Sequence, residues 1–260
     1  MDYKAASVQL KEALRLRTEP FGAIFFKNPD DLPPKTRQPS KVFGKKVTIC
    51  QGVTLARVYG WPVGLTRDDL ICIPGMLVFG FTPATDPIME LGQLFCEVGF
   101  HSEVGPALRE VEALPRFEPQ EVGAVYLCPL ERLALDPEVV VVYGNPAQLM
   151  RLIQAATFSL GARVTGEFGG KVECSEYLIA PYRSGEFRVA IPGAGDRIFS
   201  MTQDDEMVVA FPGKFLAGLL VGLKEAGKKI GARYPITFYQ NFSPSFPPAY
   251  EERAKKWGIL

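Results

Sequence analysis

The chain has 260 residues, of which 47% are apolar, and this is enough for the core of a globular protein. Its 29 Lys and Arg residues balance its 29 Asp and Glu residues, so no excess of positive charge points to nucleic acid or to an anionic membrane surface. The charged N-terminal stretch has no apolar leader, and no run of 18 apolar residues occurs. We therefore expect a cytoplasmic protein with no nucleic-acid partner and no membrane partner.

The first half of the chain predicts helices and strands in alternation. Apolar spacing indicates a helix around Leu10 and Leu14, and a proline-rich surface loop is expected over 28–41. The apolar runs over 47–58 and 70–81 are interpreted as β-rich, although Pro74 interrupts the second run. The remaining expected elements are strands over 21–26 and 124–128 and helices over 86–99 and 106–111.

The central stretch over 139–155, VVVVYGNPAQLMRLIQA, predicts a buried strand that turns directly into an amphipathic helix. Asn145 is a suitable N-cap, and Pro146 suits the first helical position because its φ angle is already set. Leu149 and Leu152 fall on one face, which we expect to pack on the sheet. The start of such a helix presents free N–H groups that can receive an anion.

The second half repeats this strand, turn and helix pattern over 206–227. Upstream, Cys50 and Ile73-Pro74-Gly75 have approximate counterparts in Cys174 and Ile191-Pro192-Gly193. These matches suggest an internal duplication, although short matches of this kind also arise by chance. We predict a single compact α+β body of sheet and helices, compatible with two similar halves around a cleft.

Five segments together carry a family resemblance: RQPSKVFGKKVTICQGVTLAR, RDDLICIPGMLVFGF, VVVVYGNPAQLMRLIQA, IPGAGDR and DDEMVVAFPG. In this order they resemble the DUF169 family of prokaryotic proteins, over about residues 10–227. The family name implies no activity, but the resemblance favours the residues in these motifs as candidates for a functional site. The IPGAGDR segment lacks a cysteine that relatives carry near Pro192-Gly193, which argues against a third thiol ligand there. The favoured positions are Cys50, Arg57, Asp69, Cys72, Asn145, Gln148, Arg151, Gly195, Asp196, Arg197 and Glu206.

Cysteines give the first candidate site. The chain has five, an odd number in widely spaced apolar settings, so we expect free thiols rather than a disulfide framework. Cys50 and Cys72 are the candidate catalytic residues, because a thiolate is both a nucleophile and a soft metal ligand, and at least one should then have a lowered pKa. With no C-x-x-C motif and a single histidine, no metal site is predicted. The alternative is that both thiols are structural.

An anion site is the second candidate. Arg197 follows a glycine-rich segment whose N–H groups can turn toward one point, and a guanidinium beside such a nest binds carboxylate or phosphate. The alternative is a tight turn with a surface ion pair. The candidate ligand-binding residues are Arg57, Asn145, Gln148, Arg151, Gly195, Asp196 and Arg197.

Other catalytic signatures are few. His101, beside Glu97 and Glu103, is a candidate acid or base that lies outside the family motifs. No dinucleotide-binding, P-loop, nucleophile-elbow or H-E-x-x-H pattern occurs, so the corresponding enzyme classes are disfavoured.

The C-terminal residues differ in character from the rest, so residues 1–233 are predicted to form the α+β domain and residues 234–260 an aromatic arm. Such an arm must pack on its own core or on a second subunit, and the second option predicts a homo-oligomer. Pro248 and Gly258 would bound a short closing helix. The seven aromatic residues are Tyr234, Phe238, Tyr239, Phe242, Phe246, Tyr250 and Trp257.

Two functional classes remain open at this point. The first is a protein that binds a small anionic ligand, carboxylate or phosphate, in a cleft lined by the arginines and the helix start at Asn145. The second is a thiol- or metal-dependent redox enzyme that uses Cys50 and Cys72. The sequence identifies no particular cofactor for either class.

Overall fold

The computed structural model describes residues 1–161, 163–235 and 245–260. Its centre is a six-stranded sheet in the order β2-β3-β1-β4-β6-β5, in which every neighbouring pair is antiparallel. The strands are β1 (Phe21–Phe26), β2 (Val63–Thr66), β3 (Ala124–Pro129), β4 (Val139–Gly144), β5 (Arg188–Ala190) and β6 (Met207–Pro212).

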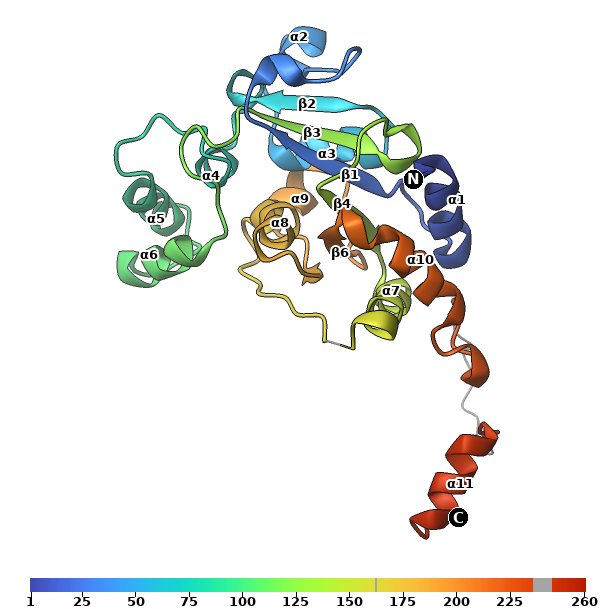
Figure 1. Cartoon of the computed structure of the whole chain (residues 1–260). Helices are drawn as coiled ribbons and strands as arrows, with labels where there is room; N and C mark the ends of the chain where they lie inside the picture. The colour runs from blue at the N-terminus through green and yellow to red at the C-terminus, as the bar shows by residue number, and fades with distance from the viewer. Residues whose placement is uncertain (162, 236–244) are drawn as a thin grey trace.

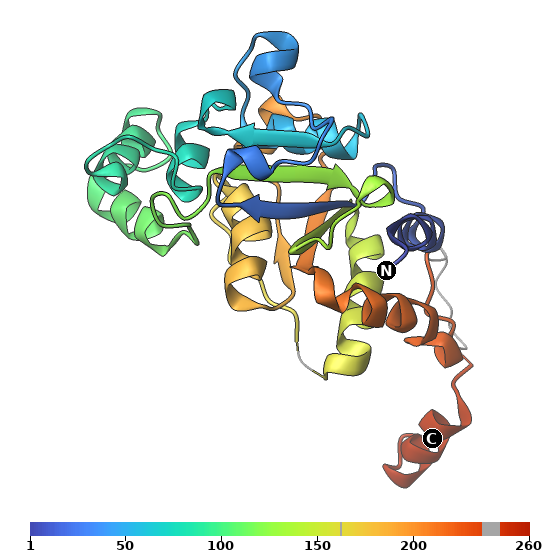
Figure 2. The ribbon, with the colours of Figure 1, turned by 45° about the horizontal axis from the view of Figure 1, so that its top comes forward.

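Helices cover both faces of this sheet and extend beyond it. Both ribbon views place α5 and α6 on the opposite side of the molecule from α1 and α10 (Figures 1 and 2). The described helices are α1 (Tyr3–Leu14), α2 (Pro39–Phe43), α3 (Ile49–Arg57), α4 (Ile73–Val78), α5 (Pro87–Glu97), α6 (Val104–Ala113), α7 (Pro146–Leu160), α8 (Ala180–Ser184), α9 (Ala194–Phe199), α10 (Leu216–Glu225) and α11 (Pro248–Lys256). The predicted α+β body is confirmed.

The core has two layers because successive strand residues point to opposite faces of the sheet. On β4, Val139, Val141 and Tyr143 join the layer that also contains α3 to α6, whereas Val140 and Val142 join the layer of α1, α7 and α10. All six residues of β4 are buried, as expected for a central strand covered on both faces.

The predicted strand and helix around Asn145 are confirmed. The Asn145 side chain accepts a hydrogen bond from the Gln148 N–H, and the Gln148 side chain accepts one from the Asn145 N–H, which forms a capping box with Pro146 in the first turn. This reciprocal pair ends β4 and starts α7.

The β-rich interpretation of 47–58 and 70–81 is wrong, because neither run forms a strand: α3 occupies most of the first run and α4 half of the second. Residues Ile49, Val53 and Ala56 are buried on one face of α3 at helical spacing, and a Thr48–Gln51 capping box starts that helix. Pro74 lies in the first turn of α4, where its missing N–H costs no hydrogen bond. The one strand of this region, β2, lies between the two helices.

The two halves of the sheet have the same strand order. In the first half β3 lies between β2 and β1, and in the second half β6 lies between β5 and β4. The halves meet where β1 pairs with β4. This arrangement agrees with the predicted pair of similar halves and brings α3 and α9, which belong to different halves, into contact.

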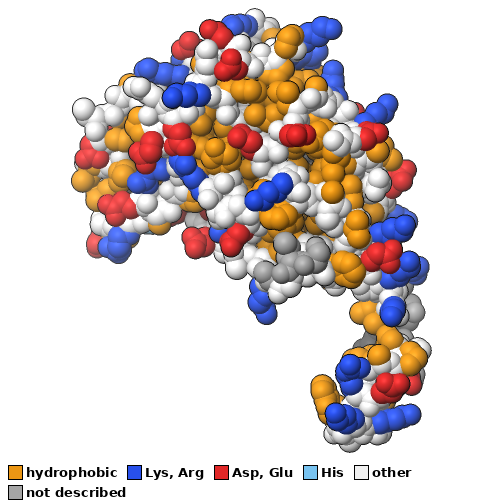
Figure 3. Space-filling model, viewed as in Figure 1, with side chains coloured by type: hydrophobic (Ala, Val, Ile, Leu, Met, Phe, Trp, Pro, Cys, Tyr) orange, Lys and Arg blue, Asp and Glu red, His pale blue; other side chains and the backbone are white. Residues whose placement is uncertain are grey.

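Surface charge is evenly mixed on the face drawn in Figure 3, where Lys and Arg side chains alternate with Asp and Glu. This agrees with the balanced charge of the sequence. None of the described helices combines the length and the apolar character needed to cross a membrane.

Candidate functional site

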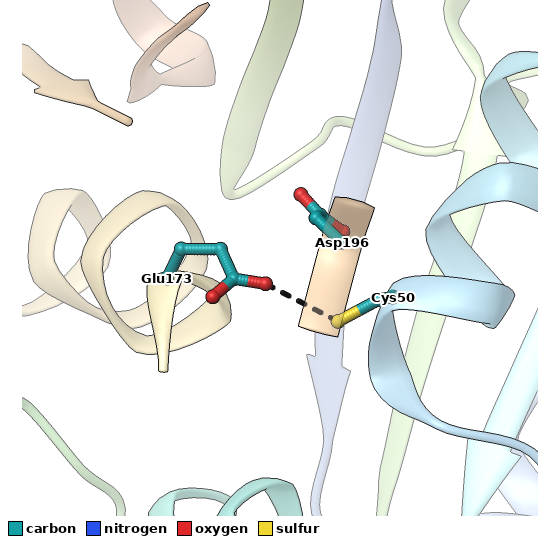
Figure 4. A group of neighbouring side chains, drawn as sticks. All are labelled: Cys50, Glu173 and Asp196. Atoms are coloured by element: carbon teal, nitrogen blue, oxygen red, sulfur yellow. Dashed lines mark hydrogen bonds between the residues drawn. The ribbon is translucent and has the colours of Figure 1, made fainter. Parts of the chain in front are cut away.

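Three acidic side chains from distant parts of the chain meet inside the protein: Cys50, Glu173 and Asp196. The Cys50 thiol donates a hydrogen bond to Glu173 Oε1 at 3.3 Å, and one donor atom from each of the three residues lies within 4.8 Å of the others (Figure 4). Their exposed fractions are 5%, 1% and 0%, so the whole group is buried.

Each of these residues lies at the start of a helical segment. Cys50 occupies the first turn of α3, and Asp196 occupies the first turn of α9. Glu173 is followed by Cys174 and then by a π-helical segment, Ser175–Ile179. A π-helical turn is rare and occurs often at functional sites, because it shifts side chains out of the regular helical register.

Glycines allow the segments to approach one another closely. A Cβ atom at Gly193 would lie 2.4 Å from Glu173 Oε2, and one at Gly195 would touch the Cys50 sulfur at 3.4 Å. Gly193 therefore has no room for a side chain, because the carboxylate and the backbone of Gly170 occupy that space.

Burial makes all three groups reluctant to ionise. Burial and the charge of Asp196 raise the pKa of Glu173 to about 8. Burial also raises the pKa of Asp196, although the hydrogen bond from Tyr143 and the charge of Arg57 oppose the rise. Burial, Asp196 and Glu173 raise the pKa of the Cys50 thiol.

Two carboxylate oxygens in this group lack a hydrogen-bond donor. Glu173 Oε2 and Asp196 Oδ1 are buried, and no described residue donates to either. A buried polar atom without a partner is costly, by roughly 1 to 3 kcal/mol. The free-energy cost of two such atoms beside a thiol therefore needs an explanation.

A second group of buried side chains fixes Asp196 from the other side. The Tyr143 hydroxyl donates to Asp196 Oδ2 at 2.7 Å, and the Arg57 guanidinium lies over the Tyr143 ring, 4.1 Å from its centroid. Arg57 donates to both carboxylate oxygens of Glu206, at 3.1 and 3.3 Å. Cys50 and Arg57 are seven residues apart on α3, so they share one face of that helix.

The other candidate cysteine, Cys72, lies at the N-cap of α4, where its sulfur accepts a hydrogen bond from the Gly75 N–H at 3.4 Å. Cys72 and Cys174 are close enough to Cys50 to contribute to the rise of its pKa. The expected lowering of a thiol pKa is not found, because burial raises the pKa of both Cys50 and Cys72. All five cysteines are free, as predicted.

The predicted anion-binding residues are divided between two places. Asp196 belongs to the buried group just described, and Arg57 and Gly195 lie beside it. Arg197 donates to the backbone carbonyls of Pro192, Gln203 and Glu206, so its guanidinium closes a turn.

The remaining predicted residues lie on α7, in the other core layer. Asn145 and Gln148 bind each other's backbone, and Gln148 also donates to the carbonyls of Leu14 and Arg15. Arg151 donates to the carbonyls of Leu223 and Ala226 at the end of α10. These contacts connect α7 to α1 and α10.

Glu173 and Tyr143 complete the buried group but are absent from the sequence prediction. Glu173 directly precedes Cys174, the predicted counterpart of Cys50, and this adjacency was the available signal. Tyr143 ends the valine run of β4, where its position alone gives no sign of a polar partner.

The fold and the buried group define a two-part α+β protein with a thiol and two carboxylates at the junction of its halves. The chain belongs to the DUF169 family, described as uncharacterised ArCR, whose profile matches residues 9–221. It is also similar to the uncharacterized protein MJ0308 of Methanocaldococcus jannaschii, with 25% identity over 176 residues that cover 67% of this chain and 75% of that protein. No solved structure matches the chain.

Proposed function

We propose that the protein binds a divalent transition-metal ion through Cys50, Glu173 and Asp196. The observation that supports this most directly is the pair of partnerless carboxylate oxygens beside the thiol. A bound cation supplies what these oxygens lack and offsets the repulsion among three acidic groups. This proposal develops the second of the two classes considered from the sequence, the thiol- or metal-dependent one. The partners of Cys50 are now Glu173 and Asp196 instead of Cys72.

The donor set restricts the choice of ion. A thiolate with two carboxylates suits zinc or iron(II) better than calcium or magnesium, which take oxygen ligands. Three protein ligands leave a fourth position in a tetrahedral site, and catalytic zinc sites use that position for water or substrate. An ion such as iron, which changes oxidation state, would place the protein among the redox enzymes.

Tyr143 and Arg57 act as positioning residues in this proposal. Tyr143 holds one oxygen of Asp196, which leaves the other free for the ion. Partners of this kind orient a ligand and commonly change metal affinity by about 10- to 100-fold. Arg57 supports the Tyr143 ring and is itself neutralised by Glu206.

The test is a metal-binding measurement on the full chain. We expect the purified protein to contain about one zinc or iron ion per chain by elemental analysis, and the cobalt-loaded form to show a thiolate-to-cobalt absorption band. Cys50→Ser should lose that band and most of the metal. Cys128→Ser is the matched control, because Cys128 is a buried free thiol in the opposite core layer.

Two results would contradict the metal proposal. One is full-length protein that binds neither zinc, iron nor cobalt after reduction of its thiols. The other is metal binding that Cys50→Ser and Cys128→Ser leave equally intact, since the ion would then lie elsewhere.

A second candidate, the binding of a small anionic ligand, has its own supporting observation. A pocket of about 380 Å³ is lined by Arg151, Lys224, Lys228 and Arg233, with no carboxylate among the described residues that line it. We expect inorganic phosphate or citrate to raise the melting temperature, and Lys224→Gln with Arg233→Gln to reduce that rise. An unchanged response in the double variant would exclude this pocket.

The proposal includes a cytoplasmic location, because five free cysteines are typical of a reducing compartment.

A further inference from the structure

A cavity lies beside the π-helical segment and is lined by Gly169 and Glu176. It has a volume of about 720 Å³ and is bounded by α6, α8, β5 and residues 165–169. This volume is in the range of small-molecule sites. Its apolar wall includes Leu114, Phe168, Ala180 and Val189.

Glu176 is the buried polar group of this cavity. It belongs to the π-helical segment, and only 7% of its surface is exposed. Its Oε1 atom accepts a hydrogen bond from the Gly169 N–H at 2.8 Å, while Oε2 is buried and receives no donor from any described residue. Burial raises the pKa of this carboxyl, and the nearby charge of Glu110 raises it further.

Apart from Glu167, which is exposed to solvent, the other charged side chains at the cavity have partners. Arg183 pairs with Glu121 at 2.5 Å, and Arg188 pairs with Glu186 at 3.1 Å. Glu110 pairs with Lys171 at 2.8 Å and also contacts His101. Glu176 is the buried carboxyl at the cavity with no direct ion pair among the described residues, although the charge of Lys171 acts on it, and a cationic donor would supply a direct partner.

We propose that this cavity binds a small molecule that carries a protonated amine and an apolar body. The ammonium group pairs with the carboxyl group of Glu176, which lines the cavity, and the apolar body packs against Phe168 and its neighbours. This inference does not depend on the proposed metal centre, although the same segment of chain supplies Glu173 to one site and Glu176 to the other.

The test compares three probes of one shape by calorimetry: phenethylamine, 2-phenylethanol and 3-phenylpropanoate. We expect phenethylamine to bind at least about tenfold more tightly than the other two, because it alone supplies a charged donor. Glu176→Gln should reduce that affinity about tenfold or more, since it removes the charge and keeps the shape. Glu167→Gln is the matched control, because Glu167 lines the same cavity but is exposed to solvent.

Equal affinity for the three probes would overturn the proposal, and so would equal amine binding by wild type and Glu176→Gln. Should Glu176→Gln fail to fold, Ala180→Leu provides a second test, because it adds volume inside the cavity and should weaken amine binding. Unchanged amine binding in a folded Ala180→Leu variant would also overturn the proposal. All titrations are run in the presence of a chelator, so that failure of the metal proposal does not affect their outcome.

Discussion

At the scale of single residues, sequence reasoning found several members of the buried site but not their grouping. It placed Cys50 in a thiol site and Asp196 in an anion site, whereas the structure brings both to Glu173. Cys50 and Glu173 are 123 residues apart in the chain. Periodicity and motif spacing describe local structure, and they contain no information about which distant segments meet.

The unusual ionisation of Glu173 predicts a specific pH dependence. The Glu173 pKa is about 8 in the folded protein and 4.5 as its ordinary value. In the metal-free protein, the folded state holds a proton that the unfolded chain releases, so the free energy of unfolding should fall as pH rises from about 5 to about 8. In the pH range where Glu173 is the only group whose protonation differs between the folded and the unfolded state, the free energy of unfolding falls by about 1.4 kcal/mol per pH unit.

Urea unfolding at several pH values, with a chelator present, measures this slope. Glu173→Gln should flatten it, because an amide does not titrate, while the raised pKa values of Asp196 and Cys50 make contributions of their own. A bound metal should reverse the trend, since it displaces protons and binds more tightly at higher pH. Identical slopes in wild type and Glu173→Gln would show that Glu173 ionises normally.

At the scale of elements, strong local signals predicted structure well and weak ones did not. The capping box at Asn145 fixes both the end of β4 and the start of α7, and each feature is visible in the sequence. The secondary structure of the apolar runs around Cys50 and Cys72 was harder to predict, because a short apolar segment fits a buried helix or a strand equally well. The Thr48–Gln51 capping box was the local signal that favours the helix.

The π-helical segment is an element that sequence patterns do not reveal. Its five residues, Ser175–Ile179, are all buried, and within them Glu176 and Tyr177 point polar groups into the protein interior. In a regular α-helix over the same residues, these side chains would point in other directions. The same segment therefore shapes the wall of the large cavity and the neighbourhood of Glu173.

At the scale of the whole molecule, the repeated strand order explains why the site lies where it does. Cys50 precedes the edge strand of the first half, and Cys174 precedes the edge strand of the second half. Two halves related in this way bring equivalent helix starts toward their shared junction. The strand order and the two cysteines are those expected of the internal duplication that the sequence suggests, whereas Glu173 and Asp196 both come from the second half.

The C-terminal arm leads to a prediction about assembly. Tyr234 is attached to the core, since its hydroxyl accepts a hydrogen bond from Asn145 at 3.0 Å. In contrast, α11 lies away from the sheet in both ribbon views, and apolar side chains appear on its surface in Figure 3. Tyr250 is 54% exposed and Trp257 70%. Phe238, Tyr239 and Phe242 lie outside the described residues.

We expect a second copy of the chain to cover this exposed aromatic helix. Each aromatic side chain can bury roughly 150 to 250 Å², and the free energy gained by this burial should outweigh the entropy lost when the arm becomes ordered. A chain that ends at Arg233 should remain folded and fall to monomers in light scattering or native mass spectrometry, whereas the full chain should be an oligomer. The double variant Tyr250→Ala and Trp257→Ala should weaken the assembly without removing the Tyr234 anchor. A full-length protein that is already monomeric, or a shortened chain that keeps the full oligomeric state, would show that the arm does not hold an assembly together.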